Sequence, residues 1–154
     1  MVCDLVNSKI LPGRPVALAE DPNGLVVLAV RPQGTAQEQN YEGLYGVDLI
    51  GGTITTFLRH QDHPTDLHFE EAWDTGGNGL TLLGPNVYFT TSPGTGNPSR
   101  VYSAPRVQNA KPTIFADGLV RAQDIATDGA SLFYVDRGKE DGTAPGFVFQ
   151  KRAP

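Results

Sequence analysis

Apolar and β-branched residues fall in short runs along the whole chain, and each run ends at turn-forming residues. Most connections between the runs are shorter than the dozen or so residues that a parallel crossover needs, so neighbouring strands should pair antiparallel. The 18 glycines and 12 prolines leave little room for long helices, and only 68–73 has the composition of a helical turn or two. The pattern therefore predicts an all-β chain. Ten runs are expected as strands: 25–30, 44–49, 53–58, 80–83, 86–91, 100–104, 112–116, 124–127, 132–136 and 147–150.

Two of the runs are apolar at consecutive positions, "LVVLAV" at 25–30 and "LFYV" at 132–135. A strand with one face in water should alternate apolar and polar residues, so these strands are expected to be covered on both faces. Small antiparallel sheets covered on both faces are what the stacked blades of a β-propeller provide. The sequence therefore predicts propeller-like antiparallel blades.

An internal repeat supports this prediction. Residues 44–58 align with 101–115 at a spacing of 57 residues, and 86–94 align with 131–139 at a spacing of 45, which bracket the usual length of a blade. We expect one domain over residues 1–154, with about three four-stranded blades at 16–60, 79–117 and 122–151.

Three blades are fewer than the four to eight that close a propeller. The last repeat stops after its third strand, and residues 2–10 could supply a lone strand that completes it. Two alternatives stay open. The chain is a fragment or an incomplete, divergent propeller, which the sequence favours, or several chains assemble to close a ring.

The connections differ between the two edges of the predicted sheets. Those on one edge are short, such as "GPN" and "DGAS". The connections on the other edge are long and polar, and elaborated loops are where scaffolds usually carry recognition. This face is expected at residues 31–43, 60–69, 92–99, 117–124 and 136–146.

All three histidines, His60, His63 and His68, lie in "HQDHPTDLHF" at 60–69, together with Asp66. If 66–69 are extended, Asp66 and His68 point to the same side, where they could hold a divalent metal such as zinc or calcium with a second imidazole. Their spacing matches no strong zinc signature, so a solvated loop without a cofactor is the favoured interpretation.

Two further segments carry candidate chemistry. Trp73 in "EEAWD" either fills a gap between blades or offers a stacking platform to a sugar or peptide. In "DRGKEDG" at 136–142, Asp136 and Asp141 are expected to form turns rather than to bind calcium, because the acidic spacing of a calcium loop is missing.

The composition of the chain disfavours some classes of binding partner. The chain has 12 Lys and Arg against 17 Asp and Glu, a net charge of −5, which argues against nucleic acid and anionic membranes. No apolar run approaches the roughly 20 residues that span a bilayer, and no signal peptide is expected. Cys3 is the only cysteine, so an internal disulfide is impossible.

The segments "NVYFTTSPG" (86–94), "SLFYVDRGK" (131–139) and "VYSAPRVQNAKPTIFADG" (101–118) resemble the repeats of bacterial propellers of the TolB-like, six-bladed type. The resemblance covers about 16–151. It implies an extracytoplasmic location, periplasmic or at the cell surface.

The resemblance, the loop asymmetry and the lack of catalytic motifs favour a non-enzymatic binding or protein-interaction module over an enzyme. Its long-loop face would take a protein or small-molecule ligand at Asp66, Trp73 and Asp124. The alternative that the resemblance implies is a metal-dependent hydrolase of the lactonase type, with Asp66, His68 and Asp124 at the mouth of the channel. The chain would act as a homo-oligomer or as part of a longer protein, and no catalytic residue is predicted.

Overall fold

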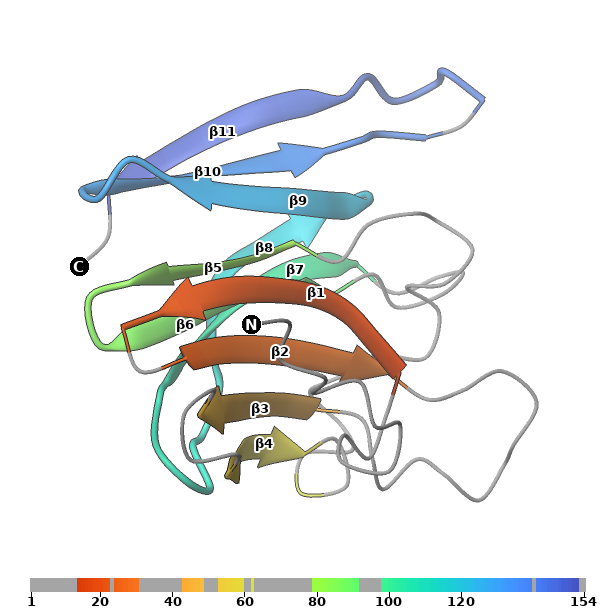
Figure 1. The fold of residues 1–154 in the computed structure, drawn as a ribbon. Coiled ribbons are helices and arrows are strands. Elements are labelled where there is room, and N and C mark those ends of the chain that lie inside the picture. Colours follow the sequence, from red (N-terminus) through yellow and green to blue (C-terminus); the bar gives the residue numbers. More distant parts are fainter. Residues whose placement is uncertain are drawn as a thin grey trace, which may run out of the picture.

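The computed structural model describes residues 14–22, 24–30, 43–48, 53–59, 62, 79–91, 98–139 and 141–152. These residues form three antiparallel sheets, each built from one continuous stretch of the chain (Figure 1). The first sheet contains β1 (Arg14–Asp21), β2 (Gly24–Val30), β3 (Gly43–Asp48) and β4 (Ile54–Arg59) in that order. The second contains β5 (Leu80–Leu83), β6 (Asn86–Thr91), β7 (Ser99–Pro105) and β8 (Thr113–Leu119). The third contains β9 (Ala122–Thr127), β10 (Ser131–Asp136) and β11 (Phe147–Arg152).

The all-β prediction is confirmed over these residues, and all ten expected strands among them form. The strand list missed β1, and the predicted bounds of β8 and β9 were too short. The expected lone strand at 2–10 and the helical turn at 68–73 lie outside the described residues.

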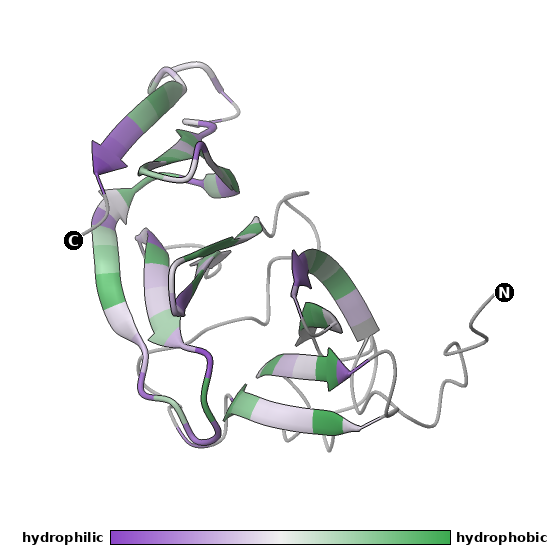
Figure 2. Cartoon of the chain, turned by 60° about the vertical axis from the view of Figure 1, so that its left-hand side comes forward, coloured by the Kyte–Doolittle hydropathy of each residue, from purple (hydrophilic) through white to green (hydrophobic). Residues whose placement is uncertain are grey.

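The three sheets lie one beside the next, with the second sheet in the middle (Figure 2). The first strand of each sheet makes the connection, since β5 contacts both β1 and β9. In the second sheet, β6 is buried on both faces: Val87 and Phe89 belong to the core shared with the first sheet, whereas Tyr88 belongs to the core shared with the third. The expectation of two covered faces, which was made for 25–30, is confirmed in β2 at Val26 and Val27, since these adjacent side chains point to opposite faces and are both buried.

The core between the first and second sheets is aliphatic with one aromatic pair. Val26, Leu44 and Leu58 of the first sheet pack against the second, where the rings of Phe89 and Tyr102 stack with their centroids 5.7 Å apart. Burying a side chain of this size contributes about 1.5–3 kcal/mol.

The core between the second and third sheets is built around aromatic rings. Phe115 on β8 meets Tyr88 edge-on at 5.2 Å and Tyr134 at 6.4 Å, and Tyr134 stacks on Phe149 of β11 at 5.2 Å. The ammonium of Lys151 lies 4.3 Å from the centre of the Phe115 ring and donates a hydrogen bond of 2.6 Å to the Phe115 carbonyl. These contacts fix the third sheet against the second.

The third sheet differs from the expectation of burial on both faces. Along β10, Leu132, Tyr134 and Asp136 are buried while the residues between them are only half-buried. On β11, Phe147 is 53% exposed and Val148 is 73% exposed, and no described strand pairs with the outer edge of β11. The prediction that the strand at 132–135 is covered on both faces is wrong, because among the described residues only the second sheet packs on the third.

Candidate functional site

The edge that receives the predicted long connections includes the β8–β9 and β10–β11 connections, and we call it the long-connection edge. The prediction of a long polar loop at 117–124 is wrong. Strand β8 continues to Leu119 and β9 starts at Ala122, so only Val120 and Arg121 connect them. The buried side chains of Leu119 and Ala122 explain why the strands extend this far.

Asp136 is the polar centre of this edge. Its side chain is 5% exposed at the end of β10, and its carboxylate accepts three backbone hydrogen bonds. Oδ2 accepts from the Val120 amide at 2.8 Å, and Oδ1 accepts from the amides of Arg121 at 2.9 Å and Gly138 at 3.0 Å. One carboxylate therefore ties the β8–β9 connection to the start of the β10–β11 connection.

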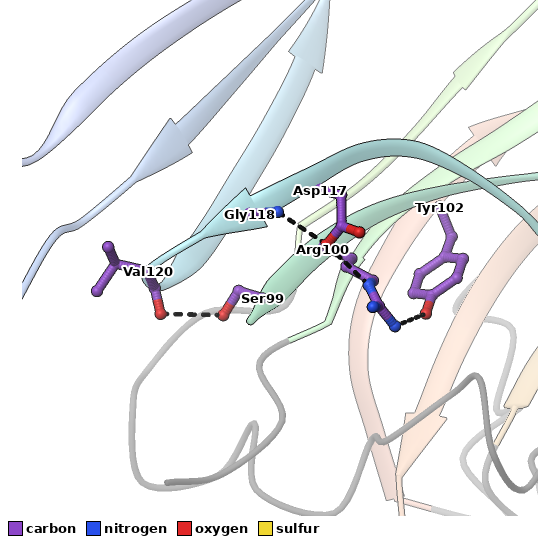
Figure 3. A network of polar contacts seen from close by, with 6 residues as sticks. All are labelled: Ser99, Arg100, Tyr102, Asp117, Gly118 and Val120. Atoms are coloured by element: carbon purple, nitrogen blue, oxygen red, sulfur yellow. Dashed lines mark hydrogen bonds and ion pairs between the residues drawn. The ribbon is translucent and has the colours of Figure 1, made fainter. Parts of the chain in front are cut away.

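Four further hydrogen bonds support the same edge. The amide of Arg137 donates to the carbonyl of Arg121 at 2.9 Å, and the hydroxyl of Ser99 donates to the carbonyl of Val120 at 3.3 Å (Figure 3). The buried hydroxyl of Thr90 accepts from the Gly79 amide at 2.7 Å and donates to the Gln123 carbonyl at 3.3 Å. The second and third sheets are thus held together by polar contacts beside the loops.

An ion pair lies on the surface of the second sheet next to these contacts. Nε of Arg100 donates to Oδ1 of Asp117 at 2.9 Å, and Nη1 of Arg100 lies 3.4 Å from the hydroxyl of Tyr102 (Figure 3). The hydrogen bond from Arg100, and after it the one from the Gly118 amide, lowers the pKa of the Asp117 carboxyl. The hydrogen bond to Asp117 in turn raises the pKa of the Arg100 guanidinium. Both groups stay charged at neutral pH.

Asp124 is the only residue of the predicted ligand-binding and metal set that the structure describes. It is exposed on β9, and its Oδ1 accepts from the next amide, that of Ile125, at 2.8 Å. A Cβ at Gly79 would lie 2.4 Å from the Ile125 nitrogen and 2.7 Å from the Asp124 Cα, so the backbone of Asp124 lies against the residue that precedes β5. Whether Asp124 binds a ligand stays a prediction.

The other candidates lie outside the described residues: His60, His63, Asp66, His68 and Trp73. Within the described ranges, no group of three or more His, Cys, Asp or Glu side chains comes together as a metal site. No helix in the same part of the chain is long and apolar enough to cross a membrane.

The prediction that Asp136 and Asp141 form turns is confirmed. Asp136 accepts from the amide two residues later, and Asp141 accepts from both the amide of Thr143 at 2.9 Å and its hydroxyl at 2.6 Å. The hydrogen bonds from Val120 and Arg121 to Asp136 were not predicted from the sequence. One feature of the sequence could have indicated this role. Asp136 directly follows a strongly apolar run, where its side chain is expected to be buried, and a buried carboxylate needs hydrogen-bond donors.

At the opposite edge, the connection between β7 and β8 spans seven residues, 106–112. This connection reaches the first sheet at two points. The side chain of Arg106 pairs with Asp21 at the end of β1, and the Ala110 amide donates to the Phe57 carbonyl on β4 at 2.7 Å. The connection therefore joins two sheets.

The fold and these edges define an all-β protein of three packed antiparallel sheets. Searches with protein-family models, among curated proteins and among solved structures found no match to the chain.

Proposed function

We propose that this chain is a non-enzymatic binding or protein-interaction module that uses the long-connection edge of a propeller-like array. The observation that carries the proposal is the carboxylate of Asp136, which holds two connections of this edge in fixed relation. A binding surface made of loops needs such support, because a ligand otherwise has to order the loops when it binds.

The order of the sheets also favours the proposal. Each sheet meets its neighbour through its first strand, and the strands of every sheet lie side by side in chain order. This is how blades are arranged in a propeller. We extend the proposal to a TolB-like, extracytoplasmic bacterial protein on the strength of the repeat resemblance alone.

The test blocks one edge at a time. In a Cys3→Ser background, single cysteines are introduced at Lys139, which is exposed on the long-connection edge, and at Ala130, which is exposed in the β9–β10 turn on the opposite edge. Both variants are coupled to a maleimide polyethylene glycol. Peptides selected on the unmodified protein from a random display library are then titrated against each conjugate.

We expect the polymer at position 139 to weaken binding at least tenfold, and the polymer at position 130 to change it less than twofold. The proposal is wrong if the polymer at 139 has no effect, if only the polymer at 130 blocks binding, or if no peptide can be selected. Melting of both conjugates, followed by circular dichroism, controls for unfolding.

The metal-dependent lactonase-type hydrolase remains the alternative prediction. Of its residues, Asp124 alone lies in the described structure, as an exposed side chain on β9. Metal analysis of protein purified without a histidine tag, repeated on His63→Ala and His68→Ala, tests it directly. A bound divalent metal that is lost in both variants would support this alternative over the binding module.

A further inference from the structure

The pairing of β7 with β8 is irregular near its end. It shifts register there, because two residues of β8, Asp117 and Gly118, lie opposite one residue of β7, Arg100. Such an extra residue on one strand of an antiparallel pair is a β-bulge. Gly118 has a φ of 75° in it, a conformation that glycine adopts without strain. The backbone of this dipeptide is therefore outside the regular ladder.

The amide of Gly118 lies against the side chain of the residue before it. It donates a hydrogen bond of 2.8 Å to Oδ1 of Asp117 (Figure 3). Both residues are exposed, and a Cβ added at Gly118 would meet nothing within 4 Å. The Gly118 nitrogen is thus held beside the carboxyl carbon of Asp117, in a place that water reaches.

The structure describes two other Asp–Gly pairs, and neither has this contact. The amide of Gly129 donates to a threonine hydroxyl at 3.0 Å, while Asp128 accepts from the amides two and three residues further on. The amide of Gly142 donates to a lysine carbonyl at 3.2 Å, while Asp141 accepts from the threonine two residues further on. In both pairs, the carboxylate and the glycine amide are held by different groups.

Asp124 has the contact but not the glycine. Its Oδ1 accepts from the next amide, that of Ile125, at 2.8 Å. The side chain of Ile125 branches at Cβ and is buried, so it obstructs movement of this nitrogen toward the carboxyl carbon. Asp117–Gly118 therefore combines two features that these other sites have only singly.

We propose that Asp117–Gly118 is a site of spontaneous isomerisation to isoaspartate. The nitrogen of Gly118 attacks the side-chain carboxyl carbon of Asp117, so an N–Cγ bond forms and a Cγ–O bond breaks. The amide proton and the hydroxyl of the protonated carboxyl leave together as one water molecule. A second water molecule then opens the five-membered imide. Opening at the backbone carbonyl of Asp117 leaves the main chain running through Cγ, with the composition of the protein unchanged.

Arg100 opposes this reaction. Its Nε donates to the same Oδ1 at 2.9 Å and lowers the pKa of the Asp117 carboxyl, which reduces the protonated form that reacts. The pKa of Asp128 is also lowered, chiefly by the amide three residues later, and that of Asp141 by the hydroxyl two residues later. Since all three carboxyls are held in the charged form, the position of the glycine amide decides which pair reacts fastest.

Isomerisation would change the long-connection edge. An isoaspartyl residue adds one carbon to the main chain and shortens the side chain by one, so the carboxylate no longer matches Arg100. The change falls directly before Leu119, which is buried against the third sheet, and Val120, whose amide donates to Asp136. The modification itself does not depend on the proposed function of this edge.

The test follows isoaspartate in protein kept for several weeks in neutral buffer at physiological temperature. Electron-transfer fragmentation of the peptides locates it, and the pairs at 128–129 and 141–142 are controls within the same sample. A second sample is aged in urea, where the fold no longer holds the three pairs. The variant Arg100→Gln removes the opposing guanidinium. Its matched control, Lys111→Gln, makes the same charge change at an exposed residue of the β7–β8 connection.

In the folded protein, isoaspartate should form at position 117 at least threefold faster than at 128 or 141, and in urea the three rates should agree within twofold. Arg100→Gln should raise the rate at 117 at least threefold without changing the other two, whereas Lys111→Gln should change none. Equal rates in the folded protein, the same order of rates in urea, or no effect of Arg100→Gln would each overturn the proposal. The first comparison needs no variant, so it decides the matter whether or not Arg100→Gln folds.

Discussion

The carboxylate of Asp136 offers the sharpest test of how the long-connection edge is held together. It is almost fully buried and accepts three backbone hydrogen bonds, from Val120, Arg121 and Gly138. The substitution Asp136→Asn keeps the shape of the side chain. It replaces one oxygen by an NH₂ group, which cannot accept a hydrogen bond.

The expected loss follows from these contacts. The side-chain oxygen of the introduced asparagine can take the place of Oδ1 and keep two of the three bonds, which leaves an NH₂ group facing the Val120 amide. A net hydrogen bond to a charged group contributes about 1.5–3 kcal/mol, so Asp136→Asn should lower the free energy of unfolding by about 2–3 kcal/mol. Asp136→Ala removes all three bonds and should lower it by about 4 kcal/mol.

Urea unfolding followed by circular dichroism measures both losses, and hydrogen exchange shows where they arise. The amides of Val120, Arg121 and Gly138 should lose protection first. The matched control is Asp128→Asn, since Asp128 is exposed and its side-chain oxygen accepts from the amides of Ala130 and Ser131, a turn that asparagine also forms. If Asp136→Asn and Asp128→Asn lower the free energy of unfolding by amounts that agree within about 0.5 kcal/mol, the carboxylate of Asp136 does not hold this edge together.

Three other predictions concern the packing of the sheets and the charge of the surface. Gly79→Ala should lower the free energy of unfolding by about 2–3 kcal/mol, because the added methyl group pushes β5 away from β9. Gly84→Ala should lower it by only about 1 kcal/mol, since Gly84 has a φ of 57° and open space around it. Equal losses in urea unfolding would contradict this expectation. Arg106→Lys should lower the free energy of unfolding by about 1–2 kcal/mol, because an ammonium cannot reach Asp21 and the carbonyls of Gly84 and Pro85 together. Stability equal to wild type in the same assay would contradict a role of Arg106 in joining the first and second sheets. The pKa of Asp117 is lowered in the folded chain from its ordinary value of 3.8, so the stability that this carboxylate contributes is complete above pH 3.8 and is lost as the pH falls through the folded pKa. The melting temperature of Asp117→Asn should therefore fall less steeply between about pH 5 and pH 2 than that of the wild type.

Local patterns predicted most strands because apolar runs here are short and end sharply. Strands β5 and β6 have the predicted bounds, 80–83 and 86–91. Strand β1 was missed because "RPVALAED" contains a proline and two alanines, which are residues with low β propensity. Only its pairing with β2 makes it a strand.

Tertiary contacts explain where the local rules failed. "DG" at 117–118 has the form of a turn, yet β8 runs through it with Gly118 at a φ of 75°. Likewise, nothing near Arg106 in the sequence indicates Asp21, which lies 85 residues away along the chain. The candidate site could be anticipated as an edge of the sheets but not as the particular side chains that hold it.

Strand β11 has a consequence for handling the protein in solution. One edge of β11 pairs with β10, but no described strand pairs with its other edge, and its residues include a 53% exposed Phe147 and a 73% exposed Val148. Such an edge can act as a template for strands of other molecules. Lys151 and Arg152 end this strand, and charged residues beside an apolar segment oppose such stacking through repulsion between copies. Replacing them with neutral residues should make the purified protein assemble into aggregates at lower concentration, and high salt should have the same effect on the unaltered chain.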